Sequence, residues 1–503
     1  MTRRSFVQSA PAVLAPRFGR PNILFLMADQ FRYDGLRANG NSLIQTPHLD
    51  ALAAQSANCS QFFVQAPVCV PSRVSYFTGR YPHSHKNRVN YTPCDPREIF
   101  VQKMLQDAGY QTGSVGKLHY YPPTASHARE TGFDSVLLHD GVAATDPYSD
   151  YVRWRQTHDP QASVPYQALA RSVPHGKNPF RSAIPYEFTP TRWTGEETCR
   201  MLRNFSSSRQ PFFLFSSFFK PHSPFGIPEP FDGMYDEVTF PLPRRVTLED
   251  IQKLPLPLQK LILRAPEYKT DPQRLQWIYR SYYAAIAMVD REIGSILKLL
   301  NDSGRANDTI VIFGTDHGAQ LLEHGLMDKN VFFEASEHVP FLIRYPARIQ
   351  PGRYPQLLES VDVLSTILDL CGIPVPDRVQ GRSFADLVTG KSGYVERDLV
   401  FSENIIPEVI TTRTLNMPFV PGKGIAGIRH PDAKMVRSAR WKYNYYPGSG
   451  AELFDLQNDP NEEKNLAADP GHLPVVNELR TAMLEWMITA DENDQIAPRW
   501  LLS

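Results

Sequence analysis

The sequence predicts an α/β fold: a large, mainly parallel central sheet flanked by helices, with a smaller C-terminal α+β domain carrying a short antiparallel sheet. Two apolar runs, residues 22–29 (NILFLMAD) and 308–315 (DTIVIFGT), have the composition of central strands buried on both faces. Helical and strand patterns alternate around these runs, which is typical of a parallel sheet. A chain of 503 residues is long enough for one large domain with an appendage.

The alternation is clearest in the first part of the chain. A proline at the first helical position predicts a helix over residues 46–57, and the segment 69–80 also has the pattern of a helix start. A helix over 98–108 and a strand over 111–117 follow. Between residues 121 and 190 the periodicity weakens and prolines accumulate, so we expect a long irregular insertion there.

The rest of the chain continues with an apolar strand over residues 211–217 and a second proline-rich stretch over 221–266. After residue 390 the composition changes, so we expect a main domain over 21–390 and a C-terminal subdomain over 391–503. The other expected elements are a long helix over 273–300, a strand over 339–345, a helix over 358–370, strands over 399–403, 435–446 and 452–455, and a closing helix over 473–489.

The composition excludes several classes of protein. The chain has 53 basic and 53 acidic residues and no basic run, which argues against nucleic acid as a partner. No apolar run reaches the roughly 18 residues of a membrane span, so we expect a soluble folded body. The five cysteines are too few and too scattered for a disulfide framework or a paired-cysteine zinc site.

The N-terminal residues 1–20 have a composition of their own. Arg3-Arg4, followed by Ser-Phe-Val, is similar to a twin-arginine export signal, which would send the protein to the periplasm. The apolar part that follows is short and interrupted by Pro11, so a disordered tail on a cytoplasmic protein is the alternative.

Residues 69–80 (CVPSRVSYFTGR) predict an anion site at a helix start. Pro71 suits the first turn of a helix, which places Cys69 just outside it and facing unpaired backbone N–H groups. Arg73, four residues on, can extend its guanidinium towards the same end. Taken separately, a cysteine is most often a small buried apolar residue and an arginine most often lies on the surface. Together they place a reactive group beside an anion site.

Two aspartates predict a metal site. Asp29 and Asp316 each end a buried strand, and the carboxyl ends of parallel strands lie along one edge of a sheet. Neighbouring carboxylates there would repel unless a cation binds, and Gln30 and His317 can add neutral ligands. Oxygen-rich ligation favours Ca²⁺, whereas a histidine nitrogen leaves room for Mn²⁺. The alternative is that each aspartate only caps a turn or a helix.

The segment 69–80 also resembles a family signature. Its motif residues are Cys69, Pro71, Ser72, Arg73, Thr78, Gly79 and Arg80. They resemble the signature of the type I, formylglycine-dependent sulfatases of the alkaline phosphatase-like superfamily. Phe77 stands where the family usually has leucine, and the resemblance extends from about residue 22 over nearly the whole chain. It implies a sulfuric ester hydrolase whose Cys69 is oxidised to formylglycine by a formylglycine-generating enzyme.

The same resemblance assigns a metal and further catalytic residues. The ligands it implies for one divalent metal are Asp29, Gln30, Cys69, Asp316 and His317. Residues 116–119 (GKLH) resemble a second sulfatase signature, in which Lys117 holds a sulfate oxygen and His119 helps to regenerate the formylglycine. If this backbone is extended, Lys117 and His119 point to the same side. The resemblance also makes His222 the proton donor to the leaving group and Lys329 a second sulfate-binding lysine.

The implied reaction hydrolyses a small-molecule or saccharide sulfate ester. The hydrated formylglycine attacks sulfur and an alcohol or phenol leaves; the aldehyde then re-forms and sulfate is released. Arg73, Lys117 and Lys329 hold the charged oxygens. The proline-rich insertions would set the substrate.

Two departures from the commonest sulfatase pattern leave an alternative within the superfamily. Gln30 stands where many members have aspartate, and His317 where many have asparagine; both are similar to branches that include choline-sulfatase-like and phosphonate monoester hydrolase-like members. A phosphonate monoester or phosphodiester hydrolase is therefore the alternative. A third hypothesis is a non-catalytic sulfoglycan-binding protein whose Cys69 is never converted.

Overall fold

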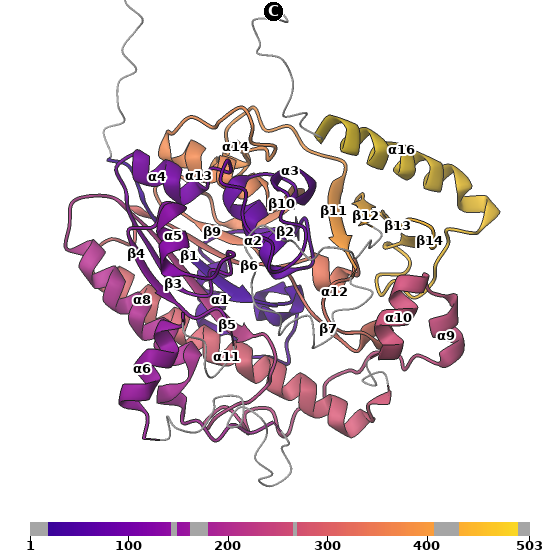
Figure 1. The fold of residues 1–503 in the computed structure, drawn as a ribbon, viewed down its shortest axis with the longest axis horizontal. Coiled ribbons are helices and arrows are strands. Elements are labelled where there is room, and N and C mark those ends of the chain that lie inside the picture. Colours follow the sequence, from indigo (N-terminus) through magenta and orange to yellow (C-terminus); the bar gives the residue numbers. More distant parts are fainter. Residues whose placement is uncertain (1–18, 142–147, 161–179, 265–268, 407–431, 491–503) are drawn as a thin grey trace, which may run out of the picture.

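The computed structural model describes residues 19–141, 148–160, 180–264, 269–406 and 432–490 (Figure 1). Its main feature is an eight-stranded sheet in which β9 is antiparallel to its two neighbours and the other pairs are parallel. The predicted fold class is therefore confirmed. In order across the sheet, the strands are β10 (Gly352–Glu359), β2 (Ala57–Phe63), β9 (Leu342–Arg344), β6 (Thr309–Thr315), β1 (Asn22–Asp29), β5 (Phe212–Pro221), β3 (Gln111–Gly116) and β4 (Ser135–Leu138).

The central strand β1 is buried on both faces, as its continuous apolar run predicts. It pairs in parallel with β5 and β6, and its side chains alternate between two cores. Leu24 and Leu26 lie in the first core, whereas Phe25 and Met27 lie in the second. The helices of the first core are α1 (Pro47–Ala53), α8 (Pro190–Ser206) and α11 (Pro272–Asp302); those of the second are α2 (Cys69–Thr78), α4 (Val101–Asp107), α5 (Ala125–Glu130), α13 (Asp362–Cys371) and α14 (Ala385–Thr389).

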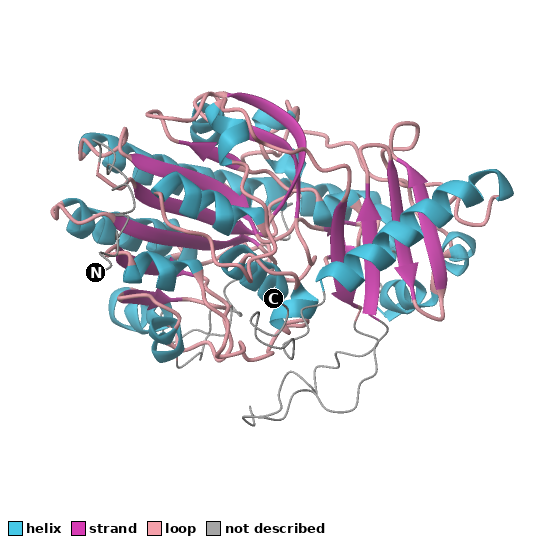
Figure 2. Cartoon of the chain, turned by 90° about the horizontal axis from the view of Figure 1, so that it is seen from above, coloured by secondary structure: helices cyan, strands magenta, loops and turns pink. Residues whose placement is uncertain are grey.

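A separate antiparallel sheet lies in the C-terminal region, beside the large sheet (Figure 2). Its four strands are β11 (Val400–Ile405), β12 (Asp432–Arg437), β13 (Trp441–Tyr446) and β14 (Gly450–Asp455). Helix α16 (Leu473–Ala490) packs on one face, and α9 (Leu248–Lys253) and α10 (Leu256–Arg264) pack on the other. The short sheet predicted for this region is confirmed. The domain boundary between residues 390 and 391 stays a prediction.

The sequence does not predict β10, at one edge of the large sheet, or β2, which lies next to it. The helix expected over 46–57 is too long: α1 ends at Ala53, and β2 begins at Ala57. The β2 sequence ANCSQFF has little strand propensity, so its pairing with β10 and β9 determines its conformation. Strand β10 contains Pro355, which an edge strand tolerates at an irregularity of the ladder.

The expectation of a long irregular insertion over 121–190 is wrong for the part of it that the structure describes. Its described part contains α5, the edge strand β4 and α6 (Asp150–His158). Strand β4 is only four residues long, too short to show a period of two. Helix α8, which follows, was also missed, and α9 and α10 lie within the second proline-rich stretch. Other short elements include α3 (Pro82–His85), α12 (Glu334–Glu337), β7 (Gln320–Leu321) and β8 (Met327–Asp328).

The composition also leads to expectations about the cysteines, membrane-spanning segments and the N-terminal segment. All five cysteines lie in the described ranges, where each is buried and has a free thiol. None of the helices in the described ranges combines the length and the apolar character that crossing a bilayer requires. The N-terminal segment 1–20, expected to be an export signal or a disordered tail, lies outside the described residues except for residues 19 and 20.

Candidate active site

Cys69 is the first residue of α2. The sequence predicts that it lies just outside the helix, so the prediction is wrong by one residue. Helical hydrogen bonding starts at Val68, whose carbonyl accepts the Ser72 N–H at 3.0 Å. Pro71 still lies in the first turn, where its missing N–H costs nothing. The Val70 N–H is capped by the side-chain oxygen of Asn90 at 3.0 Å. Cys69 therefore lies at the helix N-terminus, and Asn90 is a capping residue that the sequence did not reveal.

Three nitrogen atoms from distant parts of the chain surround the Cys69 sulfur. His317 Nε2 lies 3.2 Å, Lys329 Nζ 3.3 Å and Lys117 Nζ 3.7 Å from Sγ. Burial and Asp29 both act to raise the pKa of the Cys69 thiol, but the positive charges of these groups outweigh them and lower it to about 6. The surroundings of this side chain therefore stabilise negative charge.

The two strand-end aspartates lie beside that sulfur. Asp29, Cys69, Asp316 and His317 are buried, and each offers a ligand atom within 4.8 Å of the others. The parallel pairing of β1 with β6 brings the two carboxylates together, as predicted. Asp29 Oδ1 is buried without a hydrogen-bond partner among the described residues. His317 Nδ1 lies 2.8 Å from the Gly318 carbonyl, which leaves Nε2 to act as a ligand. These residues fit a divalent metal.

Arg73 and Lys117 bind these carboxylates beside Cys69. Arg73 Nε donates to Asp316 Oδ2 at 2.8 Å, and its Nη2 lies 3.5 Å from Asp29. Lys117 Nζ donates to Asp29 Oδ2. Burial alone would raise the pKa of Asp29, but Lys117 and other nearby cations lower it well below its usual value. Asp29 is therefore held as a carboxylate, the form that binds a metal.

Gln30, a predicted metal ligand, faces a carboxylate that the sequence analysis did not single out. Its backbone N–H donates to Asp316 Oδ1 at 3.2 Å, and its side-chain amide donates to Asp328. Gln30 has a φ of 62°, so this turn is in the left-handed region. Asp328 immediately precedes Lys329, which was the only signal that it lies near the site. The role of Gln30 as a ligand stays a prediction.

The segment after β3 is not extended, which corrects the expectation for Lys117 and His119. Strand β3 ends at Gly116, where a Cβ would clash with the Ser217 carbonyl oxygen, and His119 has a φ of 59°. His119 is half-buried and interacts electrostatically with Lys117 and Asp29. Burial, and then Lys117, lower the pKa of His119 to about 3. The imidazole is therefore neutral near pH 7 and can accept a proton.

His222 lies just after the end of β5, where the sequence predicts it. Its Nδ1 is 2.6 Å from the Ser223 carbonyl, so Nε2 is the nitrogen available to a substrate. Burial, and then Lys329, lower the pKa of His222 to about 4. Asp29 and Lys117 are also within electrostatic range, so His222 belongs to the same group of side chains as Cys69.

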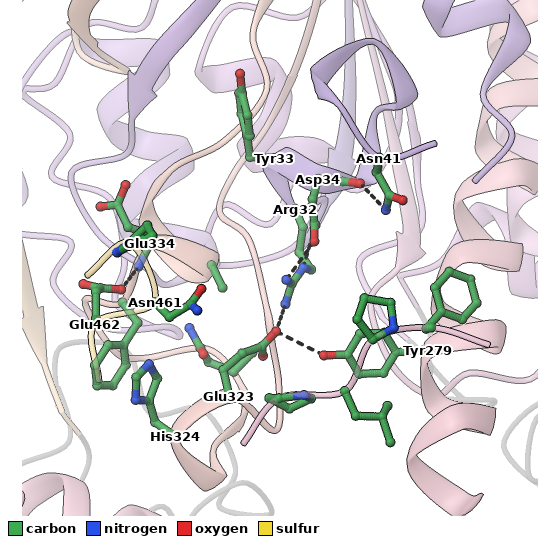
Figure 3. A pocket seen from close by; sticks show the side chains of 18 of the residues that line it. Arg32, Tyr33, Asp34, Asn41, Tyr279, Glu323, His324, Glu334, Asn461 and Glu462 are labelled. Atoms are coloured by element: carbon green, nitrogen blue, oxygen red, sulfur yellow. Dashed lines mark hydrogen bonds and ion pairs between the residues drawn. The ribbon is translucent and has the colours of Figure 1, made fainter. Parts of the chain in front are cut away.

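A pocket of about 740 Å³ is lined by residues that include Arg32, Tyr33 and Glu323 (Figure 3). Arg32, two residues after Gln30, forms ion pairs there with Asp34 at 2.8 Å and Glu323 at 2.7 Å. The described lining includes none of the predicted site residues. Gln320 lines the pocket and pairs with Asp328 in the β7–β8 hairpin, so the pocket is a neighbour of the predicted site rather than part of it.

Comparisons with known proteins agree with the resemblance stated above. The family model described as sulfatase matches residues 21–373. The chain is 28% identical over 499 residues to an arylsulfatase of Clostridium perfringens, covering 93% of this chain and 94% of the relative. It is 26% identical over 498 residues to a delta 4,5-hexuronate-2-O-sulfatase of Bacteroides thetaiotaomicron, covering 94% and 90%.

Among solved structures, the phosphonate monoester hydrolase of Agrobacterium radiobacter superposes with a TM-score of 0.80 at 26% identity, covering 94% of this chain and 96% of that one. The fold is thus shared by enzymes named for sulfate esters and by enzymes named for phosphonate esters. The family model described as sulfatase spans residues 21–373, more than half of the chain, and this match assigns the family. The chain belongs to the sulfatase family of sulfuric ester hydrolases.

Proposed function

We propose that this enzyme hydrolyses a sulfate ester, on a saccharide or a small molecule, to an alcohol and inorganic sulfate. Its nucleophile is a formylglycine made from Cys69 by a formylglycine-generating enzyme. The observation that carries the proposal is the convergence of His317, Lys329 and Lys117 on the Cys69 sulfur, beside two buried carboxylates. The similarity to a hexuronate-2-O-sulfatase supports a saccharide, and the similarity to an arylsulfatase supports aryl sulfates as assay substrates.

One divalent metal completes the proposed site, with Ca²⁺ as the expected ion and Mn²⁺ as the alternative. The proposed ligands are Asp29, Gln30, Cys69, Asp316 and His317. When bound, the ion would lower the pKa of the nucleophilic hydroxyl and neutralise charge on the sulfate. The carboxylates, one of which has an unpartnered buried oxygen, support a hard cation.

The surrounding side chains bind the ester and move protons. In this proposal Arg73, Lys117 and Lys329 hold the sulfate oxygens. Burial alone would lower the pKa of Lys329, but Cys69, Asp328 and other acidic groups raise it, so Lys329 stays charged. His222 is neutral in the free enzyme because of its pKa of about 4. A bound anionic ester favours its protonated form, which can then donate to the leaving oxygen. His119 is the base that helps to release sulfate.

The proton donor role of His222 predicts a dependence on the leaving group. His222→Ala should lower kcat/KM for alkyl sulfates by roughly 100- to 10,000-fold, the usual contribution of a general acid. The loss should be much smaller for 4-nitrophenyl sulfate, because 4-nitrophenolate leaves without a proton. Measuring kcat/KM over aryl and alkyl sulfates of graded leaving-group pKa tests this. An equal loss on every substrate would show that His222 does not donate the proton.

The competing phosphonate activity has its own support, in the structural similarity to a phosphonate monoester hydrolase and in the residues Gln30 and His317. The two activities are separated by comparing kcat/KM for 4-nitrophenyl sulfate and 4-nitrophenyl phenylphosphonate on the same preparation. We expect the sulfate to be preferred. A strong preference for the phosphonate would overturn the proposal and leave the family assignment intact.

A further inference from the structure

Asp140 lies just after β4, behind the turn that carries two of the proposed catalytic residues, Lys117 and His119. Its Oδ1 accepts the backbone N–H of Leu118 at 2.8 Å and that of His119 at 2.9 Å. Two hydrogen bonds to one carboxylate oxygen fix the orientation of both peptide units, and bonds to a charged acceptor are the stronger kind. Asp140 thus ties the end of β4 to the turn after β3.

The backbone turn at residues 116–119 needs a hydrogen-bond acceptor, such as the Asp140 carboxylate, to hold its conformation. His119 has a φ of 59°, in the left-handed region, which a residue with a side chain adopts only when its surroundings hold it there. Gly116, three residues earlier, has a φ of 92° and packs against the Ser217 carbonyl. The chain therefore turns sharply between two fixed points, one at Ser217 and the other at Asp140. The imidazole of His119 is placed by this turn.

Asp140 and His119 each have one buried side-chain atom without a hydrogen-bond partner among the described residues. These atoms are Asp140 Oδ2 and His119 Nδ1. The two side chains are within electrostatic range of one another. A carboxylate oxygen is the natural acceptor for an imidazole Nδ1–H, and protonation of Nδ1 leaves Nε2 with the lone pair that accepts a proton. The atoms are thus complementary in charge and in hydrogen-bonding capacity.

We propose that Asp140 is the positioning residue of His119. Through Oδ1 it fixes the backbone turn that presents the imidazole. We assign Oδ2 as the acceptor of the His119 Nδ1–H, a bond that the two atoms do not make in this structure; that bond would hold the tautomer with the proton on Nδ1 and leave Nε2 for the reacting group. The inference rests on the proposed role of His119 and extends it to a residue outside the signature segments 69–80 and 116–119. A purely structural role, joining β4 to β3, is the alternative that the experiment must separate.

The chain offers a matched control in Asp134, at the other end of β4. Its Oδ2 accepts the backbone N–H and the hydroxyl of Thr112, both at 2.9 Å, at the start of β3. Asp134 therefore makes the same kind of link between the same two strands, far from the proposed chemistry. If Asp140 is only structural, Asp134→Ala and Asp140→Ala should affect turnover alike.

The test uses the full-length enzyme at equal formylglycine content, with 4-nitrophenyl sulfate as substrate. Asp140→Ala should lower kcat by roughly 10- to 100-fold, the usual effect of losing the partner that orients a functional histidine, while KM changes little. Asp134→Ala should leave kcat near the wild-type value. In the double variant Asp140→Ala/His119→Ala, the loss should not exceed that of His119→Ala alone, because both changes remove one function.

Each other outcome overturns a defined part of the account. If His119→Ala lowers kcat but Asp140→Ala does not, or if the two losses multiply, Asp140 does not act through His119. If His119→Ala retains full kcat, the proposed role of His119 fails and the inference fails with it. Should Asp140→Ala not fold, Asp140→Asn carries the same test, because its amide oxygen can still accept both backbone bonds. A wild-type kcat in Asp140→Asn would refute the orienting role of Oδ2.

Discussion

Replacing Cys69 with alanine should abolish hydrolysis of 4-nitrophenyl sulfate, lowering kcat by roughly 10,000-fold or more, as expected when a nucleophile is removed. The Cys69 sulfur is the atom on which the side-chain nitrogens of His317, Lys329 and Lys117 converge, at 3.2 to 3.7 Å. The hydroxyl of Ser72, three residues on, is engaged elsewhere, because its Oγ donates to the Asp316 carbonyl. Initial rates on purified enzyme at saturating substrate measure the effect.

The matched control for this change is Cys199→Ala. Cys199 is also a buried free thiol, but it lies in α8 and burial raises its pKa to about 11, so it has no reactive character. We expect this variant to turn over at close to the wild-type rate. Residual turnover above a few per cent in Cys69→Ala would mean that the nucleophile is another group.

Removing the metal should have an effect of similar size. Chelation with EDTA is expected to lower kcat by roughly 1,000-fold or more, since metal activation of a nucleophile and charge neutralisation together supply several kcal/mol. Ca²⁺ should restore the activity, because carboxylates make up much of the proposed ligand set. Metal content measured by mass spectrometry alongside activity tests this. Restoration by Mn²⁺ but not by Ca²⁺ would change the assigned ion.

A pair of variants at residues flanking the two ends of β6 links the loss of metal to the proposed ligands. Asp316→Asn, at the carboxyl end of the strand, should lower both metal content and kcat. Asp308→Asn, just before the other end, loses only a surface ion pair and a side-chain contact to Asn22, and should leave both unchanged. Full activity in a metal-free preparation, or full metal binding in Asp316→Asn, would contradict the metal site.

The parts of the structure that follow local rules were predictable from the sequence. Strands β1 and β6 were found almost to the residue, because burial on both faces leaves a continuous apolar run. The parallel-sheet rule then placed Asp29 beside Asp316 without any knowledge of the fold. The position of Cys69 at a helix N-terminus followed from Pro71, with an error of one residue.

The remaining features depend on contacts that a local pattern does not contain. Strand β2 is strand only because β9 and β10 pair with it, and β4 is too short to show periodicity. The left-handed turn at His119 depends on a carboxylate supplied by Asp140, 21 residues later in the chain. Asp328 and Asn90 enter the site by comparable long-range bonds. No spacing or motif in the sequence indicates Asn90 or Asp140, and Asp328 is indicated only by its place immediately before Lys329.

The most direct test of the central claim is the mass of the tryptic peptide that contains Cys69, from protein co-expressed with a formylglycine-generating enzyme. The account predicts that an aldehyde or its hydrate replaces the thiol, and that specific activity rises in proportion to the converted fraction. An unmodified thiol in a preparation that hydrolyses sulfate esters would contradict it. So would complete conversion without hydrolysis, whereas an unconverted chain that binds sulfated saccharides without cleaving them would indicate the non-catalytic alternative.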